Sequence, residues 1–257
     1  MTARSVLLAA LGVILLLVAV DKLRPTSAAD ADALPADTLA ATVGTRSPAA
    51  GGPPGRRLDQ RVRDAQIGRI RRSAGQTYLD SLFTGTDSLI RRWPDLDGPA
   101  ARAVQVAMVP GGSPDYRPRF QSLVRDAASR WEQQGLGFRF RFQADTAGAD
   151  IIVRWRTSFA PTERAGQTDL KWDQLGHIRS ALITLAIRDP GQRPFGDEAL
   201  RAVAVHELGH AVGLPHSADP GDVMYPRTRT GEISGRDRAT AMLLYQLVPG
   251  SLKAGER

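Results

Sequence analysis

The stretch that decides the fold lies at positions 206–216 and reads His206-Glu207-Leu208-Gly209-His210-Ala211-Val212-Gly213-Leu214-Pro215-His216. Residues four apart on an α-helix lie on the same face, so a helix here presents His206 and His210 to a single ion. Glu207 is rotated by about 100° from His206, so its carboxylate points past the ion and can hold a bound water instead of acting as a ligand. The pattern therefore predicts a helix with a metal-binding face.

Gly213 and Pro215 predict how the third histidine reaches the same ion. A continuing helix would carry His216 away, whereas glycine adopts the left-handed conformation that ends a helix and turns the chain. Proline then discourages the helix from resuming. Three core histidines without a metal would lack partners for their polar atoms. We therefore predict one zinc ion held by His206, His210 and His216 with an open fourth position; nickel, iron and cobalt are the alternatives.

The residues after the third histidine indicate more closely which kind of metalloprotein the chain resembles. Ser217 follows it directly, and Met224-Tyr225-Pro226 begins eight residues beyond it. Together with the three-histidine stretch, these residues resemble the metzincin metallopeptidases and, among them, the matrixin type. The resemblance implies an α+β fold: a twisted mixed sheet with two packed helices, an antiparallel edge strand, a methionine turn (Met-turn) under the imidazoles and a C-terminal helix.

The same resemblance implies a zinc-dependent endopeptidase, a hydrolase that cleaves protein or peptide substrates. Glu207 is expected to be the catalytic residue, taking a proton from the metal-activated water and passing it to the leaving amine. The peptide is expected to lie extended along an edge strand, which we assign to residues 178–187. The alternatives are a zinc amide hydrolase acting on cell-wall or other non-protein substrates, and a non-catalytic binding module. An intact Glu207 argues against the binding module.

Two features that are typical of matrixins are missing from the sequence. The chain has no cysteine, which excludes disulfides, thiolate ligands and a latency switch based on a pro-segment thiol. Only His177 lies upstream of the motif, so we expect no second, structural zinc and predict that His177 is not a ligand. Glu163, Asp169 and Asp173 fit no calcium-loop spacing, which leaves calcium without support.

Composition divides the chain into four segments. Residues 1–24 contain an apolar run at 6–20, which predicts a cleaved signal peptide or an N-terminal membrane anchor and, with either, an extracytoplasmic protein. Residues 25–56 are rich in Ala, Pro and Gly and are predicted to be a disordered linker. Residues 57–98 have apolar positions at helical spacing, which predicts a helical pro-segment or accessory element. Residues 99–249 are predicted to be the zinc metallopeptidase domain.

Hydrophobic periodicity within that domain indicates the order β-α-β-β-β-α-loop-α. Alternating or β-branched runs predict strands at residues 103–109, 138–142, 150–155 and 178–187. An apolar stripe predicts a helix at 120–133, and a second helix at 200–214 is expected to be capped by Asp197. Ser234 and Asp237 form a capping-box pattern before a final helix.

The charge of the chain argues against one class of partner. Its net charge is +7, with 34 Lys and Arg residues against 27 Asp and Glu residues. A nucleic-acid-binding protein concentrates its basic residues on one face or stripe, whereas these are scattered along the sequence. We therefore expect no nucleic acid partner, and we expect a monomer that binds a protein or peptide substrate.

Overall fold

The computed structural model describes residues 60–84, 88–94, 103–228 and 230–253. The predicted signal peptide or anchor at 1–24 and the predicted linker at 25–56 lie outside these residues. Within the described ranges, no helix has both the length and the apolar character needed to cross a membrane.

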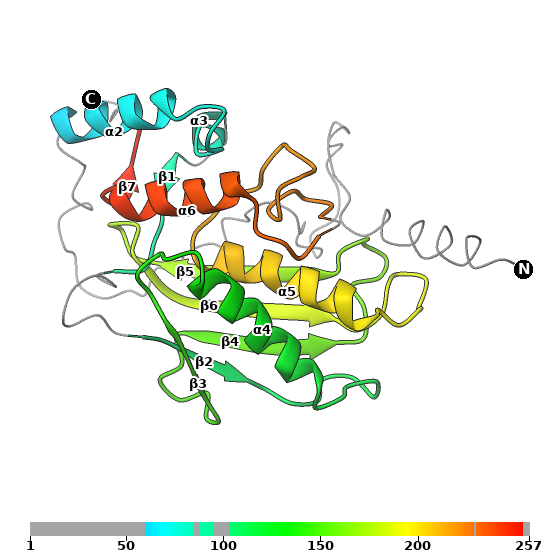
Figure 1. Cartoon of the computed structure of the whole chain (residues 1–257). Coiled ribbons are helices and arrows are strands. Elements are labelled where there is room, and N and C mark those ends of the chain that lie inside the picture. Colours follow the sequence, from blue (N-terminus) through cyan, green and yellow to red (C-terminus); the bar gives the residue numbers. More distant parts are fainter. Residues whose placement is uncertain (1–59, 85–87, 95–102, 229, 254–257) are drawn as a thin grey trace, which may run out of the picture.

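A five-stranded sheet forms the centre of the described fold (Figure 1). Its strands are β2 (Val104–Met108), β3 (Phe140–Gln143), β4 (Ile151–Arg156), β5 (Gly166–Trp172) and β6 (Ile178–Ala186). They lie in the order β3-β2-β4-β6-β5, and every pair of neighbours is parallel except β6 and β5. The α+β fold with a mixed sheet and an antiparallel edge strand is therefore confirmed.

The antiparallel edge strand is β5, and our assignment of that role to residues 178–187 was wrong. Those residues form β6, which pairs with β4 on one side and with β5 on the other. An internal strand is covered on both edges and reads as apolar, whereas an edge strand is exposed along one side and tolerates polar residues. β5 was absent from the predicted elements because its sequence, GQTDLKW, buries a single side chain.

Two helices, α4 (Phe120–Glu132) and α5 (Asp197–Ala211), pack on one face of the sheet (Figure 1). The apolar stripe predicted on α4 is buried. Trp131 of this stripe donates its indole N–H to the carbonyl of Val205 at 2.8 Å, which joins the two helices directly. The helix that carries the histidine motif is therefore held from both the sheet and α4.

The starts of two helices test the capping predictions. The N-cap of α5 is Gly196 and no side chain caps it, so the predicted cap by Asp197 was wrong. That carboxylate lies in the first turn instead, where the helix dipole favours negative charge. Helix α6 (Gly235–Gln246) begins with the predicted capping box, in which Ser234 and Asp237 each accept the other's backbone N–H.

The segment predicted at 57–98 contains helix α2 (Gln60–Arg72), a single turn α3 (Ser81–Thr84) and strand β1 (Leu89–Ile90). Strand β1 pairs antiparallel with β7 (Gly250–Ser251), which follows α6. Helix α2 lies beyond α6, on the side away from the sheet (Figure 1). A small second sheet thus joins the N-terminal segment to the end of the described chain.

Side chains of this N-terminal segment enter the core of the domain. Ile70, Leu79, Ile90 and Trp93 are fully buried and belong to one cluster with residues of α5 and α6. Trp93 also donates its indole N–H to the carbonyl of Ala211, at the end of α5, at 2.9 Å. Burial of each large apolar side chain contributes roughly 1.5–3 kcal/mol, so we expect the segment and the domain to unfold together.

We predict that Leu79→Ala lowers the free energy of unfolding of the whole domain by about 2–5 kcal/mol, because it leaves a cavity in the shared core. Val62→Ala on α2 is the matched control: 38% of Val62 is exposed, and its effect should stay below about 0.5 kcal/mol. Denaturant unfolding followed by tryptophan fluorescence measures both variants. An unchanged midpoint for Leu79→Ala would mean that the segment is a separate module.

Candidate metal centre

Helix α5 presents His206 and His210 from consecutive turns, and the chain after it brings His216 beside them. Nε2 of His210 lies 3.1 Å from Nε2 of His206 and 3.1 Å from Nε2 of His216. The ligand atoms of all three lie within 4.8 Å of one another. The first two rings are buried, whereas His216 keeps partial exposure. All three histidines predicted as ligands are therefore brought together, and His216 is the least buried of them.

A tight turn at the end of α5 delivers His216 to the other two histidines. Gly213 has a φ of +101°. Its N–H donates to the carbonyl of His210 at 2.8 Å, and the following N–H donates to the carbonyl of Gly209 at 3.0 Å. This is the Schellman pattern, and a side chain on Gly213 would also strike the carbonyl oxygen of Arg91. Glycine is thus required both for the backbone angle and for space, as the sequence predicted.

Backbone carbonyls determine which imidazole nitrogens carry protons. Nδ1 of His206 lies 2.7 Å from the oxygen of Val223, and Nδ1 of His210 lies 2.9 Å from the oxygen of Leu214. A carbonyl only accepts, so each Nδ1 is the donor and each Nε2 of the neutral rings carries a lone pair. These lone pairs face each other at 3.1 Å and need a cation between them. Ligand nitrogens around a tetrahedral zinc ion lie about 3.3 Å apart, so the residues fit this ion.

Burial keeps the three rings neutral. Desolvation lowers the pKa of His206, and desolvation together with the neighbouring rings lowers the pKa of His210 well below its usual value. Desolvation and the nearby His206 lower the pKa of His216 to about 3. Neutral imidazole is the form that binds metal, so protons compete little with a metal ion at neutral pH.

Glu207 lies on the side of α5 that faces strand β5. The hydroxyl of Thr168 donates to Oε2 of Glu207 at 2.6 Å, and a side chain on Gly166 would strike the same carboxylate. The carboxylate is buried and is not part of the group of three ligand nitrogens. It therefore lies between the histidines' helix and the edge strand, with room provided by the missing side chain at Gly166.

His177 and two of the acidic residues considered for calcium, Asp169 and Asp173, take part in other contacts. Nδ1 of His177 lies 3.3 Å from a carboxylate oxygen of Asp173, and Arg179 donates to the same oxygen at 2.6 Å. Asp169 accepts the side-chain amide of Gln167 at 2.8 Å. Among the described residues, the three motif histidines form the one group of three or more that could hold an ion.

The Met-turn after the third histidine packs beneath α5. Met224 is fully buried, and its sulfur lies against Gly209, where a side chain on that glycine would strike it. The carbonyl of Met224 accepts the N–H of Ser217 at 2.9 Å. The adjacent carbonyl, that of Val223, holds the ring of His206. The turn implied by the resemblance is present, and it orients one of the three imidazoles.

The family model described as matrixin matches residues 112–246. This chain belongs to the matrixin family. The matched residues extend from the loop after β2 to the end of α6, so they include the three histidines, Glu207 and the Met-turn. The domain is therefore of the metalloendopeptidase class of hydrolases.

Three curated matrixin relatives are similar to parts of the chain. Matrix metalloproteinase-2 of Drosophila melanogaster is 28% identical over 204 residues, which are 68% of this chain and 25% of that protein. Metalloendoproteinase 1 of Glycine max is 27% identical over 153 residues, or 51% of this chain and 47% of that protein. Matrilysin of Felis catus is 72% identical over 52 residues, or 20% of this chain and 16% of that protein. The match thus spans a quarter of the length of the Drosophila relative and about half of the length of the Glycine max relative.

Sequence reasoning missed residues that shape the centre from a distance. Thr168 gave no signal, because it lies in a polar strand that was not predicted. Asp237 was identified only as a capping residue, yet its carboxylate also accepts the N–H groups of Val223 and Met224. The capping box was the one local signal that could have drawn attention to this carboxylate. No local pattern connects it to the Met-turn.

We predict that Gly213→Ala displaces His216 and weakens zinc binding by at least about tenfold, because both the positive φ and the contact with Arg91 oppose a side chain. Gly135→Ala is the matched control, since Gly135 has a φ of +72° and an added Cβ would meet nothing within 4 Å. That variant should lower stability by about 1–2 kcal/mol without changing zinc affinity. Competition with a chromogenic chelator measures the affinity. Equal affinities in the two variants would contradict the role assigned to this turn.

Proposed function

We propose that the chain is a zinc-dependent endopeptidase, with His206, His210 and His216 as metal ligands and Glu207 as the general base. The observation that carries the proposal is the convergence of three neutral imidazoles, whose Nε2 atoms lie 3.1 Å apart in two of the pairs. Zinc suits this donor set because it binds imidazole, needs no redox chemistry and accepts three protein ligands with an open position. Membership of the matrixin family supports the same choice of metal.

The chain's own part in the reaction is proton transfer by Glu207. Zinc, when bound, supplies a Lewis acid that lowers the pKa of water and polarises the scissile carbonyl. The Glu207 carboxylate accepts a proton from the attacking water and passes it to the nitrogen of the leaving amine. Thr168 donates to Oε2 of this carboxylate at 2.6 Å, which fixes the orientation of the base before substrate arrives.

Strand β5 provides a binding edge for the substrate. Among the described strands, β5 has β6 as its one neighbour, so its other edge offers backbone N–H and C=O groups to an extended peptide. Gly166 and Thr168 of this strand contact Glu207, and a peptide paired with β5 would pass beside the general base. We therefore infer that protein or peptide substrates bind along β5.

We further propose that the protein acts outside the cytoplasm and as a monomer. The apolar run at residues 6–20 supports export, either through a cleaved signal peptide or with the run retained as an anchor. One chain supplies the three histidines and the general base, so the proposed site needs no second copy.

We predict that Glu207→Gln keeps zinc bound and lowers kcat/KM for casein peptides by roughly 10²–10⁴-fold, because an amide cannot accept the proton. A chelator should abolish cleavage by the wild-type protein, and added zinc should restore it. His177→Ala is the matched histidine control, since this ring contacts Asp173 instead of the proposed ligands. Its zinc content and cleavage rate should equal those of the wild type.

The same preparations separate the two classes of substrate. Release of peptides from casein, without release of fragments from cell-wall polymers, is the expected result. Cleavage of wall polymers alone would contradict the endopeptidase proposal and favour the alternative, an amide hydrolase. A wild-type rate of peptide cleavage by Glu207→Gln would contradict the proposal that Glu207 is the general base.

A further inference from the structure

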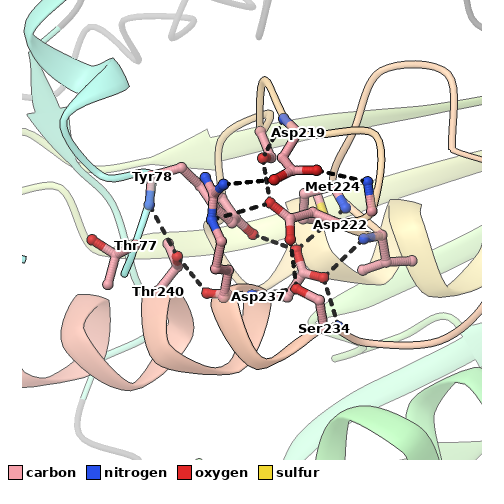
Figure 2. A network of polar contacts seen from close by, with 12 residues as sticks. Thr77, Tyr78, Asp219, Asp222, Met224, Ser234, Asp237 and Thr240 are labelled. Atoms are coloured by element: carbon pink, nitrogen blue, oxygen red, sulfur yellow. Dashed lines mark hydrogen bonds and ion pairs between the residues drawn. The ribbon is translucent and has the colours of Figure 1, made fainter. Parts of the chain in front are cut away.

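The N-terminal segment and the Met-turn meet at one buried carboxylate, that of Asp237 (Figure 2). Its Oδ1 accepts the hydroxyl of Tyr78 at 2.8 Å and the N–H of Met224 at 3.4 Å. Its Oδ2 accepts the N–H groups of Val223 at 2.8 Å and Ser234 at 2.9 Å. Asp237 is fully buried, and a carboxylate at such a site depends on donors that compensate for lost water.

The backbone of Val223 connects Asp237 to His206, a proposed zinc ligand. Its N–H donates to Asp237, and its carbonyl accepts Nδ1 of His206 at 2.7 Å. A group that bonds the outer nitrogen of a ligand histidine sets both its tautomer and its orientation. Three hydrogen bonds in series therefore connect the hydroxyl of Tyr78 to the ring of His206.

Tyr78 is itself fixed as a hydrogen-bond donor. Its backbone N–H donates to the hydroxyl of Thr240 on α6 at 3.2 Å, and the guanidinium of Arg236 lies 5.9 Å from its ring centre. Burial, followed by the charge of Asp237, raises the pKa of Tyr78 well above its usual value. The hydroxyl consequently keeps its proton and donates a hydrogen bond to the carboxylate.

The segment that carries this tyrosine is fastened to the C-terminal elements at further points. Arg69 of α2 donates to the side chain of Gln246 at 2.6 Å. Nε of Arg92 donates to the carbonyl of Leu247 at 3.0 Å, and β1 pairs with β7. The N-terminal partners in these contacts lie upstream of residues 112–246, the part that the matrixin model matches.

We propose that Tyr78 is a positioning residue for the metal centre, and that residues 60–84 and 88–94 belong to the catalytic unit instead of forming a removable pro-segment. This inference rests on the proposed function, because it takes His206 as a zinc ligand. The Tyr78 hydroxyl compensates part of the Asp237 charge and holds Oδ1, so that the carboxylate keeps the Met-turn in place. Loss of the segment would leave this buried carboxylate one donor short and would loosen the turn.

The test is Tyr78→Phe in the full chain, which removes the hydroxyl and keeps the ring. In the metal-free protein, hydrogen–deuterium exchange at the amides of Val223 and Met224 should accelerate by about tenfold, because Asp237 holds them less firmly. Zinc affinity, measured with zinc alone against a chelator, should fall by roughly three- to tenfold, near the lower end of the range for outer partners of metal ligands. Peptide cleavage should show a lower kcat with an unchanged KM, since β5 is not altered.

Thr240→Val is the matched control at the same interface. The Thr240 hydroxyl accepts the N–H of Tyr78 and donates to the carbonyl of Arg236, so its loss loosens the contact without removing a donor from Asp237. This variant should lower the thermal unfolding midpoint by a similar amount. Its amide exchange at residues 223 and 224, its zinc affinity and its kcat should equal those of the wild type.

A purely structural role for Tyr78 predicts that both variants lose stability and keep wild-type exchange, zinc affinity and kcat. That result would overturn the proposal, and so would a Tyr78→Phe chain that does not fold. The exchange measurement needs neither metal nor substrate. A failure of the proposed endopeptidase function would therefore appear in the cleavage and zinc-binding assays and leave the exchange result unchanged, which distinguishes it from a failure of this inference.

Discussion

The unprotonated Nε2 atoms of His206 and His210 lie 3.1 Å apart at the centre of this domain, and such a contact is unfavourable until a cation lies between them. Protonation of a ring does not relieve the repulsion, because burial opposes the charged form and lowers the pKa of both histidines. The metal-free protein must therefore hold the rings in place against their own electrostatics. Most other features of the site supply that constraint.

The constraint comes largely from backbone groups. The carbonyl of Leu214 holds His210, and the turn at Gly213 fixes where that carbonyl lies. The carbonyl of Val223 holds His206, and the Asp237 carboxylate fixes the N–H of the same residue. Backbone groups within tight turns have little conformational freedom left to lose, so they orient the rings at lower entropic cost than long side chains would.

The features of the site that depend on residues close together in the sequence could be predicted from the sequence alone. Residues four apart on a helix lie on one face, so the spacing of the first two motif histidines predicts that they bind together. The turn at Gly213 and the capping box are likewise set by residues within a few positions of each other. The edge strand could not be predicted, because the apolar residues of β6 reflect its place inside the sheet while β5 is polar. The bond from Tyr78 to Asp237 spans 159 positions, and nothing in either local sequence indicates the other.

The part of the chain that the matrixin model matches contains the proposed ligands but not all of the residues that support them. The matched residues 112–246 contain the motif, the Met-turn and Asp237, but several groups that fix these elements lie upstream. The carbonyl of Arg91 lies against Gly213, and Trp93 donates to the last carbonyl of α5. A boundary at residue 99, drawn from composition, would separate these groups from the turns they support. The unit that we propose to fold together is larger than the part that the matrixin model matches, because the imidazoles need restraint from residues that never contact the metal.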